Sequence, residues 1–265
     1  MSAIDDLLAA LQASANYRHV SPDLIRRVGE QELAKRRNLK TAIKSTKDKL
    51  HQVGGAFLAP EMPYARWLAD LQTAATPAEL RATCRAIMMH HASMRERLPF
   101  IEDFYAAIFA ELPPIASVLD LACGLHPLAL PWMPLAPDVT YHAYDIYQPM
   151  MDVISAFLPL AGVQGEATTW DITQSLPSVP VDLALLLKAI PCLEQIDKTA
   201  GQRIFAEIQA RTLVVSFPCQ SLGGKNKGMA DFYEAHFRVL IANKDWTIKR
   251  LLFATELVFV VTKQA

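Results

Sequence analysis

The sequence has little of what marks membrane, secreted or zinc-binding proteins. Its four cysteines lie far apart and form no Cys-x-x-Cys pair, a pattern that argues against zinc and suits a reducing cytoplasm. No apolar run approaches the ~20 residues that cross a bilayer. The first residues lack the basic and apolar regions of a signal peptide. We therefore expect a cytoplasmic protein with no membrane segment.

Glycine is also scarce, and its arrangement excludes one large class of enzymes. The chain has ten glycines and no Gly-x-Gly-x-x-Gly, which counts against a nicotinamide-dependent dehydrogenase. His90 and His91 have no third ligand at helical spacing, so we expect no metal site. With 265 residues and 52% apolar content, the chain is long and apolar enough for one large domain, or one domain with a smaller accessory.

The small net charge of −1 conceals an uneven distribution. Residues 18–49 carry a net charge of +6, which leaves −7 for the rest of the chain. This block holds ten basic side chains: Arg18, Arg26, Arg27, Lys35, Arg36, Arg37, Lys40, Lys44, Lys47 and Lys49. A basic block on a nearly neutral protein indicates a polyanionic partner at one end of the molecule. The alternative is a merely solvated surface.

The first part of the chain has helical patterns throughout. Residues 2–14 read as a short helix, and Ser21-Pro22-Asp23 starts a second that runs to about Arg37. Apolar residues at helical spacing follow as far as Gly54-Gly55, with Lys40, Lys44 and Lys47 on another face. We expect further helices over residues 62–74, from the capping box at Thr76 to Arg97, and over residues 100–112. A boundary near residue 110 gives a helical domain of residues 1–110.

Residues 111–265 alternate between strand and helix patterns. The predicted strands cover residues 118–121, 139–146, 168–172, 181–187, 212–217, 247–253 and 256–262. Such alternation demands a parallel, doubly wound α/β sheet, and the last two strands form an antiparallel hairpin. A seven-stranded sheet closed by a late hairpin resembles the Rossmann-like fold of class I S-adenosylmethionine (AdoMet) methyltransferases.

Three strand ends carry residues suited to a nucleoside. The first strand ends in the small-residue turn Ala122-Cys123-Gly124, which lets a ligand approach the backbone. Asp145 ends the second strand, where an acid accepts hydrogen bonds from ribose hydroxyls, and Asp171 ends the third, where an acid accepts from an adenine amino group. Either aspartate alone is more often a strand-end or helix-cap residue. The three together favour a cofactor site over a core turn without a ligand.

Two other features are ambiguous when taken alone. Arg97 has the two-point geometry that binds a carboxylate, yet its spacing alone favours an exposed helix charge. Residues 221–229 hold three glycines and two lysines, which suits a basic loop that closes over a nucleic-acid backbone or a flipped base. A plain surface loop is the alternative.

Four segments resemble one family of enzymes. They are Leu119-Asp-Leu-Ala-Cys-Gly-Leu-His-Pro-Leu-Ala-Leu130, His91-Ala-Ser-Met-Arg-Glu-Arg97, His51-Gln-Val-Gly-Gly-Ala-Phe57 and Val215-Ser-Phe-Pro-Cys-Gln-Ser-Leu-Gly-Gly-Lys-Asn-Lys-Gly-Met229. They resemble the aminoglycoside-resistance 16S rRNA (guanine-N7) methyltransferases, from about residue 5 to the C-terminus. The resemblance implies a helical domain that docks on the 30S subunit, a class I AdoMet domain, and methylation of a decoding-site guanine.

The resemblance also implies which residues of this chain contact the cofactor and the RNA. The resemblance puts AdoMet against Phe57, His91, Ala92, Ser93, Arg97, Ala122, Gly124, Asp145, Asp171, Ile172, Leu187 and, less surely, Gln195. It makes Arg97 the anchor of the cofactor's carboxylate. Contacts to 16S rRNA fall to Arg18, Arg36, Arg37, Lys40, Lys44, Lys47, Lys225, Lys227 and Met229. The chain departs from the family at His126, where Asn is common, and at Met94, where Thr is common.

The implied chemistry needs no catalytic acid or base. Guanine N7 carries an unprotonated lone pair at neutral pH, and the cofactor supplies the activated methyl group. The protein must extrude the base, align N7 with the methyl group and exclude water. Three alternatives remain: methylation of an adenine N1, an RNA-binding module with a degenerate cofactor site, and a small-molecule methyltransferase, which gives the basic helices no role. We expect a monomer, since the docking face must stay open.

Overall fold

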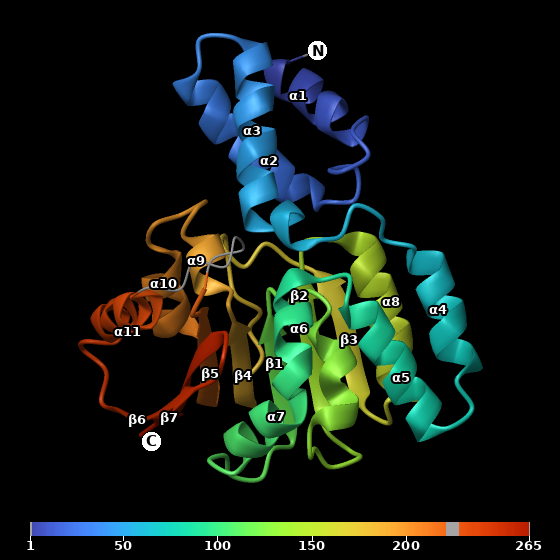
Figure 1. The fold of residues 1–265 in the computed structure, drawn as a ribbon. Helices are drawn as coiled ribbons and strands as arrows, with labels where there is room; N and C mark the ends of the chain where they lie inside the picture. The colour runs from blue at the N-terminus through green and yellow to red at the C-terminus, as the bar shows by residue number, and fades with distance from the viewer. Residues whose placement is uncertain (1, 221–227, 265) are drawn as a thin grey trace.

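A single seven-stranded sheet organises the molecule, as the alternation of strands and helices predicted (Figure 1). The computed structural model describes residues 2–220 and 228–264. The strand order is β3-β2-β1-β4-β5-β7-β6, in which β1 to β5 pair in parallel and β7 runs antiparallel to both β5 and β6. The strands are β1 Ser117–Leu121, β2 Thr140–Asp145, β3 Gln164–Thr169, β4 Val181–Leu187, β5 Ala210–Pro218, β6 Trp246–Leu252 and β7 Glu256–Lys263.

The central strands β1, β4, β5 and β7 are mainly buried, whereas the edge strands β3 and β6 are largely exposed. Successive side chains of a strand point to opposite faces of the sheet. In β1, Val118 joins one hydrophobic cluster while Leu119 and Leu121 join the other. The first cluster includes the helices before β1 and α8 (Gln148–Leu160). The second includes α9 (Ile190–Leu193), α10 (Ala200–Glu207) and α11 (Met229–Leu240). The result is a three-layer α/β/α core.

The first five helices, α1 to α5, fall into two groups in space (Figure 1). Helices α1 to α3 contact one another and form a lobe above the carboxyl ends of the strands. Helices α4 and α5 instead contact α8 and the 3-10 segment η3 (His126–Trp132). The bounds are α1 Ala3–Gln12, α2 Pro22–Lys35, α3 Leu39–Val53, η1 Gly55–Phe57, α4 Tyr64–Thr73, α5 Pro77–Met88, α6 Ala92–Arg97, η2 Leu98–Phe100 and α7 Ile101–Phe109. We call α1 to α3 the N-terminal lobe; a domain division near residue 110 stays a prediction.

Local signals account for several helix ends. Thr76 and Glu79 form the predicted capping box with Pro77 at the first helical position. The C-cap of α3 is Gly54, also as predicted. Ser21 precedes α2 and its Pro22, but its side chain makes no capping hydrogen bond.

Two sequence-based expectations were wrong in detail. The helix predicted to run from Thr76 to Arg97 ends at Met88, and His91 is extended and pairs with Leu58 before α6 begins. This pairing connects residues far apart in the sequence, which helical spacing does not reveal. The third strand ends at Thr169, so Asp171 follows it by two residues.

Candidate active site

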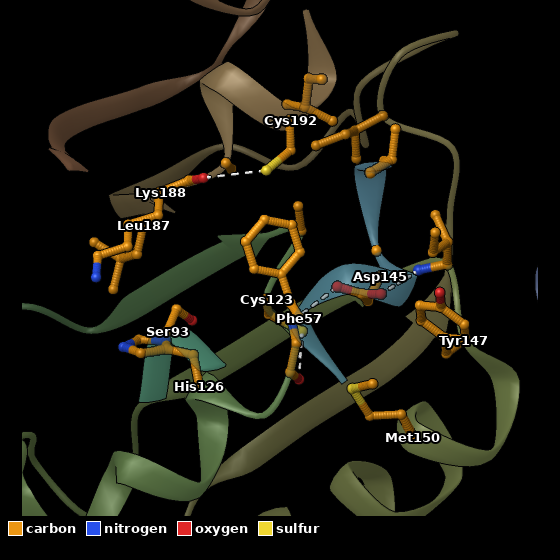
Figure 2. Close-up of a pocket in the computed structure, with 18 of the residues that line it drawn as sticks. Phe57, Ser93, Cys123, His126, Asp145, Tyr147, Met150, Leu187, Lys188 and Cys192 are labelled. Atoms are coloured by element: carbon orange, nitrogen blue, oxygen red, sulfur yellow. Dashed lines mark hydrogen bonds between the residues drawn. The ribbon is translucent and has the colours of Figure 1, made fainter. Parts of the chain in front are cut away.

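A cavity lies where the N-terminal lobe meets the carboxyl ends of β1, β2 and β4. We call it the main cavity; its empty space, open mouth included, is about 890 Å³. Figure 2 shows Asp145 and Phe57 in the middle of this view, with Tyr147 and Met150 on one side and Leu187 and Lys188 on the other. In a parallel sheet, this edge is the usual place for a ligand.

Most of the residues predicted to bind the cofactor line this cavity. They are Phe57, His91, Ser93, Arg97, Ala122, Gly124, Asp145, Asp171, Ile172 and Leu187. Two predicted residues do not line it. Ala92 is buried at the start of α6, and Gln195 is exposed and lines a neighbouring cavity. The structure therefore gathers segments that span 130 residues of sequence around one space.

The turn after β1 adopts the unusual backbone that its small residues permit. Ala122 and Gly124 have φ values of +51° and +55°, a left-handed conformation that favours residues without large side chains. A Cβ atom on Gly124 would lie 2.7 Å from Nε2 of His91. His91 in turn has its Nδ1 3.0 Å from the Ser93 hydroxyl, and burial lowers its pKa to about 3. The turn is thus closely covered by a neutral imidazole.

Asp145 lies at the end of β2 with its carboxylate held by the backbone. Its Oδ2 accepts from the amide of Gly124 at 2.8 Å, and its Oδ1 accepts from the amide of Ile146 at 2.6 Å. Burial raises the pKa of Asp145, and these backbone donors oppose the rise. Since a carboxylate has about four acceptor positions, each oxygen retains capacity for a ligand hydroxyl. This is the geometry expected of a ribose-binding acid.

Asp171 is held differently, mainly by side-chain donors. Its Oδ2 accepts from Nε and Nη2 of Arg27, at 2.9 and 2.8 Å. Its Oδ1 accepts from the amide and the hydroxyl of Thr173, at 3.0 and 2.5 Å. Protein donors therefore take all of the ~four acceptor positions of this carboxylate. The sequence assigned Arg27 only to the basic block and did not anticipate this contact.

Arg97 is fully buried, which rules out the interpretation of an exposed helix charge. Its Nε and Nη2 donate to the two oxygens of Glu256, at 3.1 and 2.6 Å, and its Nη1 lies 3.1 Å from the sulfur of Met94. Burial opposes ionisation of Glu256, but Arg97 and Lys188 outweigh it and lower the pKa of that carboxyl. Arg97 still lines the main cavity, so its role as a carboxylate anchor stays a prediction.

Two charged residues of this cluster were missed by the sequence analysis. Glu256, the first residue of β7, also accepts from the Ser216 hydroxyl. Lys188 follows β4 with a left-handed φ of +57°, and its Nζ lies 2.7 Å from Glu96 and 3.6 Å from Glu256. Nothing in the local sequence indicates a role for Glu256. Lys188 could have been recognised, because a lysine directly after a buried strand lies at the edge of the sheet where ligands bind.

His126, one of the two departures from the family, belongs to a second buried network. Its Nδ1 lies 2.7 Å from Oδ2 of Asp120, and its Nε2 lies 2.7 Å from the hydroxyl of Tyr105. Asp120 also accepts from the hydroxyl of Tyr141 at 2.7 Å. Asp120 and His126 line the main cavity. His126 therefore links Asp120 to Tyr105 beside the turn after β1. Asp120 could have been noticed in the sequence as an acid inside an apolar strand.

The predicted RNA-binding residues lie mainly on the N-terminal lobe. Arg18, Arg36, Arg37, Lys40 and Lys44 are exposed and Lys47 is half-buried. Arg36 also donates to Glu32 at 3.0 Å. Lys225 and Lys227 lie outside the described residues. Met229 begins α11 and lines the neighbouring cavity with Gln195, Pro218 and Tyr233, which we call the side cavity.

The family follows from comparison of the whole chain with known proteins. Residues 13–260 match the family model described as ribosomal RNA methyltransferase (FmrO). The chain belongs to this family. A 16S rRNA (guanine(1405)-N(7))-methyltransferase of Micromonospora rosea is 37% identical over 265 residues, which cover 98% of this chain and 97% of the relative. One from Serratia marcescens is 31% identical and covers 98% of each chain.

Solved structures of similar proteins share the FmrO-family architecture found here. The 16S rRNA methyltransferase RmtF, crystallised with S-adenosyl-L-homocysteine, is 28% identical with a TM-score of 0.84 and covers 100% of this chain and 99% of its own. The 16S rRNA methylase RmtB is 27% identical with a TM-score of 0.80 and covers 98% of both chains. The sequence-based expectations of the family and of a class I methyltransferase fold are confirmed.

Proposed function

We propose that this chain transfers a methyl group from S-adenosyl-L-methionine to N7 of a guanine in 16S rRNA within the 30S subunit, which confers aminoglycoside resistance. The observation that carries the proposal is the main cavity, formed by the strand-end turn, Asp145 and Arg97 in a chain of the FmrO family. The relative from Micromonospora rosea, similar over nearly its whole length, is named for this reaction.

The residues of the main cavity fit this cofactor. The closely covered turn at Gly124 offers backbone without a side chain, and Asp145 retains acceptor capacity for the two ribose hydroxyls. Leu187, Ile172 and Phe57 supply apolar walls. Arg97 supplies positive charge for the carboxylate, and Glu256 fixes the plane of its guanidinium. When bound, the cofactor supplies an activated methyl group on a sulfonium.

The protein's own contribution is positioning. Guanine N7 is already a free nucleophile at neutral pH, so no side chain needs to remove a proton. The main and side cavities have Phe57, Ser93, Lys188 and Cys192 in common, so a base in the side cavity would lie next to the cofactor. Burial raises the pKa of the Cys192 thiol to about 12, which keeps it protonated and unreactive. Holding the two reactants in line then lowers the barrier.

The N-terminal lobe supplies the surface for the polyanionic substrate. The exposed Lys40 and Lys44 lie one helical turn apart on α3, on the side away from the buried Ala42 and Leu50. Phosphate contacts of this kind position a nucleic acid without reading its sequence. The part of the chain that the structure describes contains no helix long and apolar enough to cross a membrane.

The decisive experiment maps the modified base. Purified 30S subunits are incubated with the protein and radiolabelled AdoMet, and the 16S rRNA is tested for strand scission after borohydride and aniline treatment, which cleaves at N7-methylguanine. We expect one cleavage, at a decoding-site guanine. A primer-extension stop at an adenine, without aniline cleavage, would instead show N1 methylation. No transfer despite binding of S-adenosylhomocysteine would show that the substrate is wrong.

A susceptibility test checks the consequence in cells. Bacteria that express the protein should resist kanamycin and gentamicin and stay sensitive to apramycin. Resistance to apramycin as well would contradict a guanine target and move it to the neighbouring adenine.

A further inference from the structure

One ion pair joins the N-terminal lobe to the wall of the main cavity. Arg27 of α2 binds Oδ2 of Asp171 through Nε and Nη2 and also contacts the hydroxyl of Thr173. The side chain of Asp171 is 6% exposed and that of Arg27 is 20% exposed. The two residues are 144 positions apart in the sequence. Charge-assisted hydrogen bonds in such a shielded place are stronger than surface pairs.

The lobe itself forms part of the cavity wall. Leu24 and Val53, from α2 and α3, line the main cavity opposite the residues at the ends of β2 and β3. Leu24 precedes Arg27 by three positions, so the two side chains share one face of α2. Arg27 therefore fastens the same helix face that presents Leu24 to the cavity.

Backbone contacts hold the start of α2 at a second point. The amide of Ser21 donates to the carbonyl of Ile146 at 2.8 Å, and the amide of Gln148 donates to the carbonyl of His19 at 3.1 Å. These bonds attach the lobe directly after Asp145. The Arg27 ion pair attaches it at Asp171. Both attachment points follow strand ends from which the cofactor site is built.

Protein donors occupy the hydrogen-bond acceptor positions of Asp171, and this limits the contacts that its carboxylate can make with a ligand. Because Arg27 and Thr173 take its acceptor positions, a direct bond from Asp171 to a ligand would require a protein donor to leave. The carboxylate instead links Thr173 to Arg27 of the lobe. These bonds fix the backbone on both sides of Ile172, which lines the cavity.

We propose that Arg27 is a positioning residue for the cofactor: through Asp171 it fixes the N-terminal lobe as one wall of the main cavity, and this sets the affinity for AdoMet. The inference rests on the proposed function only in taking the main cavity as the cofactor site. Arg27 is thereby assigned an internal role, unlike the neighbouring basic residues that face solvent.

The test measures binding of S-adenosylhomocysteine to the full-length protein by calorimetry. The key variant is Arg27→Met, and the matched control is Arg26→Met, which removes the same charge from an exposed neighbour on α2. Neither arginine lines the main cavity itself. We expect Arg27→Met to raise Kd by about tenfold, the loss that follows from removing a charge-assisted hydrogen bond. Arg26→Met should stay within about twofold of the wild type.

Two further readouts separate positioning from mere stability. Arg27→Lys keeps the charge but only part of the two-point geometry, so its Kd should fall between those of the wild type and Arg27→Met. In turnover with 30S subunits, Arg27→Met should raise KM for AdoMet while kcat at saturation is retained. The double variant Arg27→Met/Asp171→Asn should bind no more weakly than Arg27→Met alone, because the pair acts as a unit.

Equal Kd values for Arg27→Met and Arg26→Met would overturn the inference, as would a far larger loss in Asp171→Asn than in Arg27→Met. If Arg27→Met does not fold, the comparison of Arg27→Lys with Arg26→Lys decides in the same way. Failure of the proposed function would appear separately, in the wild type, as absence of methyl transfer to 30S subunits.

Discussion

Gly124 illustrates how a single small residue shapes the cofactor site. A left-handed backbone costs a residue with a Cβ roughly 1–2 kcal/mol, and at Gly124 the added atom would also meet His91 at 2.7 Å. Gly162 has a similar φ of +76° with nothing within 4 Å. We expect Gly124→Ala to weaken S-adenosylhomocysteine binding by about tenfold or more and Gly162→Ala to lower only the thermal midpoint. Calorimetry and thermal unfolding of both variants check this; equal binding by the two would refute the role of the turn.

His91 should make the stability of the protein depend on pH. Burial lowers its pKa from 6.5 to about 3, so between these values the unfolded chain takes up a proton that the folded chain does not. Stability must therefore fall as the pH drops through this window. In His91→Asn, which does not titrate, the thermal midpoint should fall less steeply from pH 6.5 to 4 than in the wild type. Parallel curves for the two proteins would show that His91 does not contribute.

Helix α6 and strand β7 are joined by the buried pair of Arg97 and Glu256. Removing one partner of a buried pair leaves an uncompensated charge and typically costs ~3–5 kcal/mol. Exposed pairs such as Arg81 with Glu102 contribute ~0–1 kcal/mol. We expect Glu256→Gln to lower the free energy of unfolding by several times more than Glu102→Gln. Denaturant titration measures both values, and a similar loss in the two variants would contradict the pairing.

The elements themselves were largely predictable, because their signals are local. Apolar runs of strand length, the capping box at Thr76 and the late hairpin all lie within short windows of sequence. The break at His91 was not predictable, since it depends on pairing with Leu58. The contacts of Arg97 with Glu256 and of Arg27 with Asp171 join residues more than 140 positions apart. Sequence periodicity identifies which residues are buried, but not which distant charges meet.

At the scale of the whole molecule, the N-terminal lobe places the basic residues next to the main cavity. The basic block predicted a polyanion surface at one end, and the structure places that end directly over the carboxyl edge of the sheet (Figure 1). The internal pairs of Arg27 with Asp171 and of Lys49 with Glu32 remove part of the block from the surface. Counting charges along the sequence therefore overstates the charge available to RNA. Lys40, Lys44 and Lys47 on α3 remain the strongest candidates for binding phosphates.

Neutralising these three lysines should weaken docking without touching the cofactor site. The triple variant Lys40→Gln/Lys44→Gln/Lys47→Gln should bind 30S subunits more weakly, and the slope of log affinity against log salt should fall by about one for each phosphate that the variant no longer neutralises. Binding of S-adenosylhomocysteine should be unchanged, since none of the three lines the main cavity. The matched control changes Lys198, Lys244 and Lys249, which are exposed and lie outside the N-terminal lobe, to Gln. If both triple variants showed the same drop in affinity and slope, binding would depend on net charge alone and α3 would not be the docking face.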